Sequence, residues 1–177
     1  RAEIIREKGT NRSRFFRGEI DRYSWVDLGS SYLPSDMLAA YLTAQLEAVD
    51  DIQARRLAIW NRYQEELAGV AADHGVQLPT VPQGSEHPAH MFYLLLPSLE
   101  ERTALIAHMR ERLVALVFHY QPLNRSEMAQ KLTHSITPMP VAESIADRLV
   151  RLPLYFGLTE DEQGRVISGL REFWQRG

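Results

Sequence analysis

Two short segments of the chain collect residue types that bind anionic groups. Residues 9–19 (GTNRSRFFRGE) and 119–125 (HYQPLNR) combine arginine and asparagine with aromatic side chains and turn-forming residues. Arginine can hold a phosphate through two parallel N–H groups, and asparagine or tyrosine can fix the ligand's orientation. The segments therefore predict a site for a polyanionic small molecule such as a nucleotide diphosphate. The alternative is a solvated loop whose arginines pair with Glu19 and Asp21.

Two histidines, His87 and His90 in HPAHMF, could suggest a metal site. Residues three apart share one face of a helix. Pro88 and the apolar residues that follow instead favour a loop that enters a strand, and two imidazoles are too few for a zinc site. We expect hydrogen-bonded structural histidines and no metal ligands.

The sequence offers no recognisable catalytic nucleophile. It lacks the Gly-x-Ser-x-Gly motif of serine hydrolases and the glycine-rich phosphate loops of Rossmann and Walker type. A Schiff-base enzyme needs a lysine with a lowered pKa at a shielded site. The only lysines are Lys8, at a charged helix end, and Lys131, in a polar segment, and we expect neither to be shielded.

The first of these segments lies in a long connection that follows a short amphipathic helix at the amino end. Residues 9–34 show no sustained periodicity, and connections of this length in compact domains are usually functional. Gly29 allows a turn, and Ser35 or Asp36 is a suitable N-cap for the helix that follows.

Apolar residues at three-and-four spacing predict a helix over residues 35–73. The pattern fits one continuous helix or two helices with a bend near Asp50 and Asp51. A helix this long is expected to connect two bodies or to lie along a partner.

The rest of the chain alternates between predicted strands and helices. The predictions are strands at 91–97, 114–120 and 150–154, helices at 99–113 and from Thr159 onward, and a long loop at 121–140 with one helical turn, followed by a short helix. This alternation predicts an α/β or α+β sandwich in which helices cover a small sheet.

Composition and charge exclude several classes of protein. The 177 residues are enough for about one domain, 45% of them are hydrophobic, and the net charge is −3. We therefore expect no nucleic-acid or membrane partner. The absence of cysteine is consistent with a cytoplasmic protein. Because the sequence starts without methionine inside a helical pattern, RAEIIREKG, we expect a fragment of a longer protein.

Five pieces, taken in order, resemble one known family. They are EIIREKGTNRSRFF, WVDLGSSYLPSDMLAAYLTAQLEAVDDIQARRLAIWNRYQEEL, HPAHMFYLLLP, FHYQPLN and ADRLVRLPLYFGLTEDEQGRVISGL. The set resembles the DegT/DnrJ/EryC1/StrS sugar-nucleotide aminotransferases, which use pyridoxal 5'-phosphate (PLP) and have aminotransferase fold type I. Within that family it is most similar to the dTDP-4-amino-4,6-dideoxygalactose transaminases of enterobacterial common antigen synthesis.

The resemblance implies a C-terminal portion of such an enzyme. Residues 1–34 would form the end of the large domain with active-site and dimer loops, 35–73 the interdomain helix, and 74–177 the small α/β domain. The Schiff-base lysine would lie before residue 1. No catalytic residue is therefore expected in these 177 residues.

The resemblance also implies cofactor-binding residues. In relatives, the loop matched by Gly29–Leu33 reads Gly-Tyr-Asn-x-Arg, and its asparagine reaches the PLP phosphate of the other subunit of a homodimer. Here Ser31 stands in place of that asparagine and Leu33 in place of the arginine. A serine hydroxyl can still donate to phosphate, so Ser31 and its neighbour Tyr32 are the expected cofactor-binding residues.

Substrate-binding residues are carried over in the same way. His119 and Tyr120 match the family's His-Tyr-x-Pro-Leu-His segment near the substrate, although Asn124 replaces its last histidine. Asn11 and Arg12 are the expected contacts to the nucleotide-sugar phosphate. The implied reaction moves an amino group from glutamate to dTDP-4-keto-6-deoxy-D-glucose. The alternative is a non-catalytic sugar-nucleotide-binding or dimerisation module.

Overall fold

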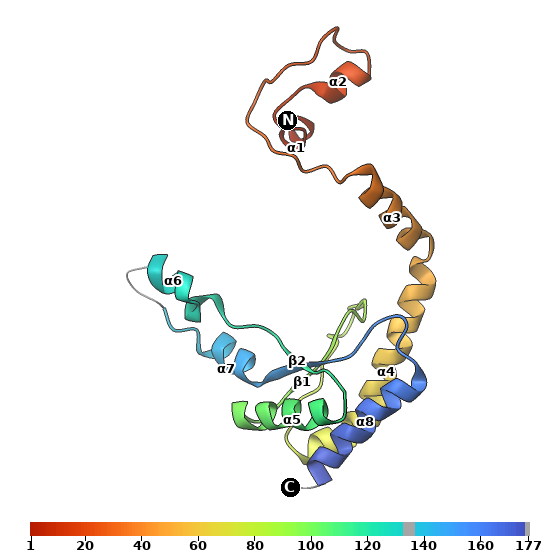
Figure 1. The fold of residues 1–177 in the computed structure, drawn as a ribbon, viewed down its shortest axis with the longest axis vertical. Coiled ribbons are helices and arrows are strands. Elements are labelled where there is room, and N and C mark those ends of the chain that lie inside the picture. The colour runs from red at the N-terminus through yellow and green to blue at the C-terminus, as the bar shows by residue number, and fades with distance from the viewer. Residues whose placement is uncertain (133–136, 176–177) are drawn as a thin grey trace. The chain divides into compact units, whose positions relative to one another are not determined.

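The computed structural model describes residues 1–132 and 137–175. The chain divides into two compact units, Arg1–Val49 and Asp50–Gly177, whose elements are labelled in Figure 1. The fold is a mixed α/β arrangement of a small sheet with helices, which confirms the predicted fold class.

The first unit consists of three helices joined by irregular chain. They are α1 (Ala2–Arg6), α2 (Arg12–Phe16) and α3 (Asp36–Glu47). Isolated antiparallel bridges join Glu7 to Ser31 and Thr10 to Trp25, so the long connection folds back on the segment after α1. The helix at the amino end is as predicted, whereas the aperiodic segment 9–34 contains a helix, α2, that the sequence pattern did not predict.

Two glycines allow the backbone segments of this unit to cross at close range. A Cβ at Gly9, where φ is +76°, would lie 1.8 Å from the carbonyl oxygen of Asp27. A Cβ at Gly29 would lie 2.2 Å from the backbone nitrogen of Gly9. No larger residue fits at either position without moving the backbone.

The long helical pattern is divided into two helices. Ser35 caps α3, since its side chain accepts a hydrogen bond from the Leu38 N–H at 3.3 Å. Ala48 leaves helical geometry with φ −102° and ψ 11°, and α4 (Val49–Asp73) begins at the next residue. The two-helix alternative is therefore correct, with the break two residues before Asp50.

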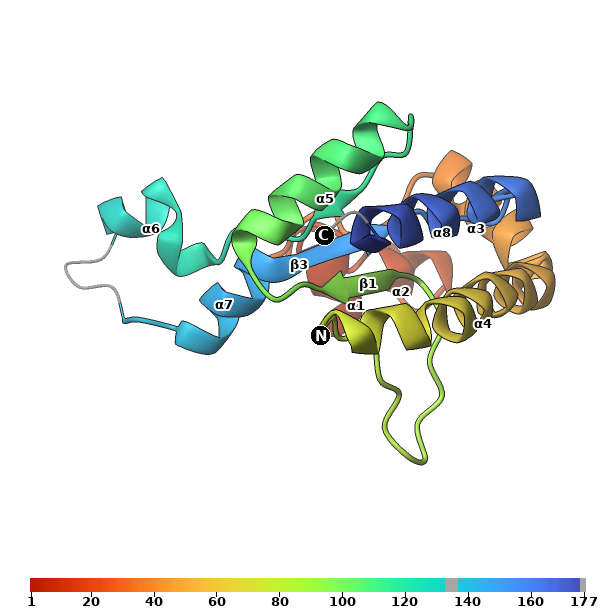
Figure 2. The same cartoon turned by 90° about the horizontal axis from the view of Figure 1, so that it is seen from below.

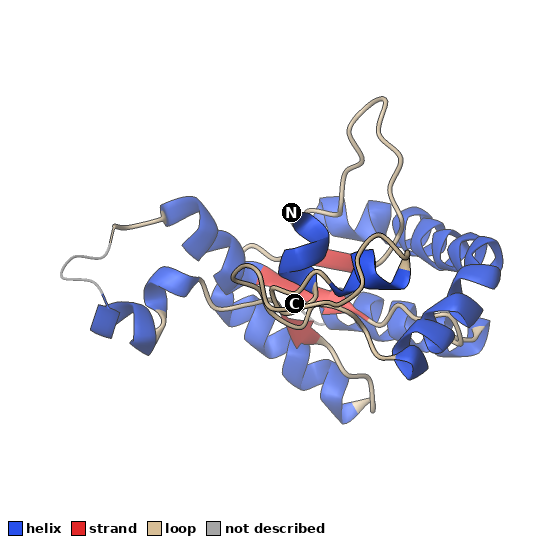
Figure 3. Ribbon diagram, turned by 90° about the horizontal axis from the view of Figure 1, so that it is seen from above, coloured by secondary structure: helices blue, strands red, loops and turns tan. Residues whose placement is uncertain are grey.

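The second unit is built on an antiparallel sheet of order β1-β3-β2. Its strands are β1 (Phe92–Leu95), β2 (Val117–Phe118) and β3 (Leu149–Leu152). Alternate residues of β1 and β3 are buried, and α4, α5 (Leu99–Glu111) and α8 (Glu160–Gln175) surround these strands in Figure 2. The strands, red in Figure 3, are few beside the helices.

The hydrophobic core lies entirely in this unit, within the residues that the structure describes. Its largest fully buried apolar side chains are Tyr63, Phe92, Ile59, Leu67, Leu94, Leu96, Leu105, Met109, Ile167, Leu170 and Val150. Two buried polar groups are satisfied across elements. The Tyr63 hydroxyl donates to the Pro153 carbonyl at 2.9 Å, and the Gln163 amide donates to the Ile59 carbonyl at 2.7 Å.

The strands differ in length from the predicted ranges. β2 has two residues where seven were predicted, because only Val117 and Phe118 pair with β3. Val114 and Leu116 are buried without joining the ladder, which explains the apolar pattern before β2. β3 begins one residue before the predicted range.

The helices of the second half are close to their predicted positions. Ser98 caps α5 by accepting a hydrogen bond from the Glu101 N–H at 3.1 Å. Thr159 and Glu162 form a reciprocal pair at the start of α8, as the sequence predicts. The segment between β2 and β3 contains η1 (Leu123–Arg125), α6 (Glu127–Leu132) and α7 (Pro140–Arg148). Part of the predicted loop, residues 133–136, lies outside the described residues.

Among the residues that the structure describes, no helix combines the length and the apolar character needed to cross a membrane.

Candidate functional site

The loop that carries Ser31 and Tyr32 is fixed through its backbone. The Ser30 N–H donates to the Ile5 carbonyl at 2.9 Å, and the Tyr32 N–H donates to the Arg6 carbonyl at 3.1 Å. In the described part of the chain, the Ser31 and Tyr32 hydroxyls make no hydrogen bond, and both residues are exposed. The backbone is thus held while two hydroxyls remain available to a ligand.

Asn11 and Arg12 differ in how far the fold already uses them. The Asn11 side-chain oxygen accepts the Ser24 N–H at 2.7 Å, so this residue holds the loop closed. The Arg12 guanidinium lies 5.0 Å from the centre of the Phe16 ring, and it forms no ion pair within the described residues. Arg12 therefore presents a cation that an anionic ligand could use.

The neighbouring arginines form ion pairs with glutamates of the same unit. Arg14 and Arg17 both contact Glu19, at 3.0 Å and 2.6 Å, and Arg17 also contacts Glu3 at 3.1 Å. Hydrogen bonds from these guanidiniums lower the pKa of Glu19. The solvated-loop alternative thus holds for Arg14 and Arg17 at Glu19, whereas Asp21 takes part in no ion pair of the described residues.

His119 and Tyr120 follow β2 and stack on one another. Their ring centres are 4.0 Å apart, and the His119 Nδ1 atom is buried without a hydrogen-bond partner in the described structure. Loss of solvent lowers the pKa of His119, and the positive charge of Arg151 lowers it further. Arg151 was not singled out in the sequence, because only the pairing of β2 with β3 brings it here.

The other polar residues of the same segment serve the fold. The Asn124 amide donates to Glu143 at 2.7 Å, and Arg125 pairs with Glu143 at 2.9 Å and with Asp147 at 2.8 Å. These contacts tie the η1 turn to α7. The HYQPLNR segment therefore divides into a ligand-accessible part and a structural part.

His87 is a structural residue, as predicted. Its ring lies 4.4 Å from the ring of Trp60, and its Nδ1 accepts the Ala89 N–H at 3.2 Å. His90 is exposed. Across residues 1–132 and 137–175, no group of three or more histidine, cysteine, aspartate or glutamate residues is arranged to hold a metal ion.

Neither lysine has the surroundings that covalent PLP attachment requires. Lys8 and Lys131 are both exposed, Lys8 in the turn after α1 and Lys131 in α6. A Schiff-base lysine must lose its proton near neutral pH, which shielding from water favours. These residues do not fit that role, whereas the exposed Ser31 and Tyr32 hydroxyls are of a type that can donate to phosphate.

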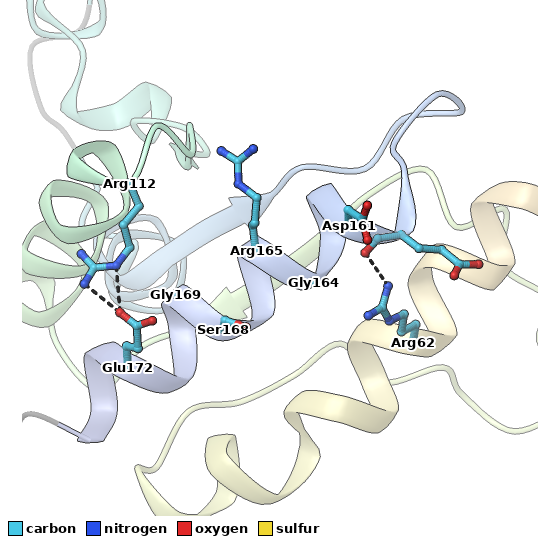
Figure 4. Close-up of a pocket in the computed structure, with 9 residues that line it drawn as sticks. Arg62, Arg112, Asp161, Gly164, Arg165, Ser168, Gly169 and Glu172 are labelled. Carbon is cyan, nitrogen blue, oxygen red and sulfur yellow. Dashed lines mark hydrogen bonds and ion pairs between the residues drawn. The ribbon is translucent and has the colours of Figure 1, made fainter.

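The outer surface of α8 bears a groove of about 620 Å³ that contains none of the predicted site residues. Some of its charged side chains are engaged internally, as Figure 4 shows for the pair of Arg112 with Glu172 at 2.8 Å, whereas Asp161 and Arg165 form no ion pair among the described residues. Arg62 likewise donates to the Glu160 carbonyl at 2.8 Å. The mixed charges and existing ion pairs give this groove no clear preference for an anion.

Comparison with known proteins places these features in context. The profile of the DegT/DnrJ/EryC1/StrS aminotransferase family matches residues 1–171. The dTDP-3-amino-3,4,6-trideoxy-alpha-D-glucose transaminase of Micromonospora megalomicea subsp. nigra is 29% identical over 167 residues, covering 93% of this chain and 44% of the relative. The erythromycin biosynthesis sensory transduction protein EryC1 of Saccharopolyspora erythraea is 29% identical over 155 residues, covering 87% and 41%. The chain thus spans less than half the length of these relatives.

Solved structures show the same fold over the same portion. The S. venezuelae protein DesV is 26% identical, with a TM-score of 0.83, and the match covers 98% of this chain and 43% of that one. The PLP form of Spr1654 from Streptococcus pneumoniae, described as a sugar aminotransferase, is 21% identical with a TM-score of 0.83, covering 98% and 42%.

Proposed function

Since the chain belongs to the DegT/DnrJ/EryC1/StrS aminotransferase family, we propose that it is the C-terminal portion of a PLP-dependent sugar-nucleotide aminotransferase. The observation that carries this proposal is the family match over residues 1–171, combined with the exposure of both lysines. The Schiff-base lysine is then supplied from outside these 177 residues, and the chain alone is inactive.

The chain's own contribution is to bind and orient. When bound, PLP supplies the electron sink through which an amino group passes from one substrate to another. Ser31 and Tyr32 donate hydroxyl hydrogen bonds to its phosphate from a loop whose backbone is already fixed. Because the backbone of the loop is already fixed, little conformational entropy is lost when the ligand binds.

The proposed substrates are glutamate as amino donor and dTDP-4-keto-6-deoxy-D-glucose as acceptor. The name of the M. megalomicea relative, a transaminase of a dTDP-amino sugar, supports a nucleotide-sugar substrate. The unpaired Arg12 cation suits the nucleotide phosphates, with Asn11 beside it. His119 and Tyr120 are the proposed substrate contacts in the second unit.

The proposed assembly is a homodimer in which the loop around Ser31 serves the partner's cofactor. Exposed apolar side chains on α3, which directly follows this loop, support an extensive contact. In this assignment residues 1–34 belong to the large domain and its loops, 35–73 connect the domains, and 74–177 form the small domain.

The proposal is tested by adding PLP to the purified 177-residue chain. We expect no lysine-bound PLP absorbance at equimolar cofactor and no adduct after borohydride reduction, because both lysines are exposed to water. The control is the chain with Lys8→Arg and Lys131→Arg, which should give the same spectrum. A stoichiometric adduct on Lys8 or Lys131, accompanied by transamination, would contradict the proposal.

The alternative function is a non-catalytic sugar-nucleotide-binding or dimerisation module. The exposure of both lysines is compatible with it as well. A longer form of the protein that includes a lysine-bearing segment discriminates the two. Transamination by that form supports the enzyme, whereas nucleotide-sugar binding without turnover supports the module.

A further inference from the structure

The central strand of the small sheet carries a cation on its less buried face. Burial alternates along β3, with Val150 and Leu152 toward the core and Arg151 on the opposite side. Arg151 lies in register with Tyr93 of β1 and Val117 of β2. Its neighbours across the sheet are therefore a phenol and an aliphatic side chain, and neither offers a carboxylate.

Arg151 lacks the acceptors that nearby arginines have. Arg102 donates to the Ala146 carbonyl at 3.0 Å, and Arg148 donates to the Ser144 carbonyl at 3.2 Å. Among the described residues, the Arg151 guanidinium has neither a hydrogen bond nor an ion pair, and its Nε atom is buried without a partner. A half-buried arginine left this way loses hydration without compensation, which costs stability.

Two further groups with unused polar atoms lie beside this cation. The Tyr120 ring centre is 5.9 Å from the Arg151 guanidinium carbon, which is within cation–π range. His119, stacked on Tyr120, has a buried Nδ1 without a partner, and it is close enough to feel the charge of Arg151. Arginine, imidazole and phenol thus converge where β2 ends beside β3.

We propose that Arg151, with His119 and Tyr120, binds a phosphate group of the nucleotide part of the substrate. The inference deepens the proposed function and rests on it for the identity of the ligand. Arginine supplies a fork of N–H donors that matches phosphate oxygens, and the neighbouring imidazole and hydroxyl supply further donors. An incoming phosphate would satisfy donors that the fold leaves without acceptors.

The charge balance of the cluster favours phosphate over carboxylate. Arg151 is always protonated, and a dianion beside His119 would favour the charged imidazole. A carboxylate carries one negative charge, which Arg151 alone matches. A diphosphate carries enough charge for both groups.

The test uses the 177-residue chain with inorganic pyrophosphate as the probe, followed by NMR and calorimetry. We expect pyrophosphate to shift the His119 and Tyr120 resonances. Arg151→Gln should weaken binding by about 10- to 100-fold, the loss expected for charge-assisted hydrogen bonds. Arg151→Lys keeps the charge but not the fork of N–H donors. Its affinity for pyrophosphate should lie between those of the wild type and the Arg151→Gln variant.

The matched control is Arg110→Gln, which removes an exposed α5 arginine with no side-chain hydrogen bond in the described structure. It should leave pyrophosphate binding unchanged. Equal losses in the Arg110 and Arg151 variants would show non-specific charge attraction and overturn the proposal. So would the absence of pyrophosphate binding to the wild-type chain, or acetate binding as tightly as pyrophosphate.

A misfolded glutamine variant is recognised by circular dichroism. In that case the Arg151→Lys variant tests the proposal. If this chain is folded and its pyrophosphate affinity is unchanged, the guanidinium fork does not bind the phosphate and the proposal is overturned. Pyrophosphate binding requires neither PLP nor a lysine. Its failure is therefore distinguishable from a failure of transamination in a longer form of the protein.

Discussion

Residue type alone does not separate ligand-binding side chains from structural ones in this chain. Asn11 and Asn124 have the chemistry expected of a phosphate site, yet the side chain of each forms a hydrogen bond within the protein. Asn11 accepts from the Ser24 N–H, and Asn124 donates to Glu143. Arg12 belongs to the same segment as Asn11, yet its guanidinium forms no ion pair among the described residues. The difference depends on contacts 13 or more residues away, which a local pattern does not reveal.

At Ser31 we predict a loss of cofactor retention without a loss of fold. Ser31→Ala, made in a form of the protein that binds PLP, removes one hydroxyl donor to the phosphate. Affinity for PLP, measured by its retention during dialysis, should fall by about 10- to 100-fold, the effect of one hydrogen bond to a charged group. Ser30→Ala is the control, since Ser30 holds the loop through its backbone. Equal retention in the two variants would return Ser31 to a purely local role.

At the scale of single elements, α5 depends on the N-cap residue that precedes it, Ser98. The Ser98 hydroxyl accepts the Glu101 N–H, a group that otherwise has no partner within the helix. Ser98→Ala should lower the free energy of unfolding by about 1 kcal/mol. Urea titration followed by tryptophan fluorescence measures this, because Trp60 and Trp174 are buried in the same unit. Ser98→Asn keeps the acceptor and should behave as wild type, whereas an unchanged midpoint in the alanine variant would contradict the cap.

Elements set by local chemistry are the ones that the sequence predicts well. The starts of α3 and α8 follow from a serine or threonine N-cap with acidic residues in the first turn. The sequence indicates a bend near Asp50 and Asp51 but does not place it at Ala48, because alanine is a good helix former. The two-residue length of β2 depends on pairing with β3, more than 30 residues later in the sequence.

Strand pairing also determines why Arg151 is not recognisable from the sequence as a candidate site residue. Arg151 lies in a segment that reads as a plain strand, and nothing near it in the sequence signals a ligand. It joins His119 only through the register that places Val117 opposite Arg151. Non-local pairing of this kind cannot be derived from a single sequence pattern.

At the scale of the whole molecule, the two units differ in how their apolar residues are used. Every buried hydrophobic residue of the core cluster belongs to Asp50–Gly177. The described helices of Arg1–Val49 bury none of their residues. On α3 the exposed large apolar side chains are Met37, Leu38, Tyr41, Leu42 and Leu46. An apolar helix surface of this extent is typical of a contact with another polypeptide.

We predict that this helix surface supports association between copies of the chain. Replacing Leu38 and Leu42 with glutamate should shift the population from dimer to monomer in analytical ultracentrifugation, because burial of a charge in an apolar contact is costly. Gln45→Glu, also on α3, is the charge control and should remain dimeric. A wild-type chain that is monomeric at about 100 μM would contradict a dimer contact by α3, since micromolar association is the weak limit of a stable interface.

The close crossing at Gly9 and Gly29 restricts how this protein can change over evolutionary time. A Cβ at Gly9 would meet the backbone of Asp27, and a Cβ at Gly29 would meet the backbone of Gly9. Because glycine is already the smallest residue, no second substitution can compensate for added volume at either position. The side chains of Ser30, Ser31 and Tyr32 are exposed and are free to vary on a backbone whose path is fixed. Substitutions can therefore change the exposed side chains of this loop while the path of its backbone stays the same.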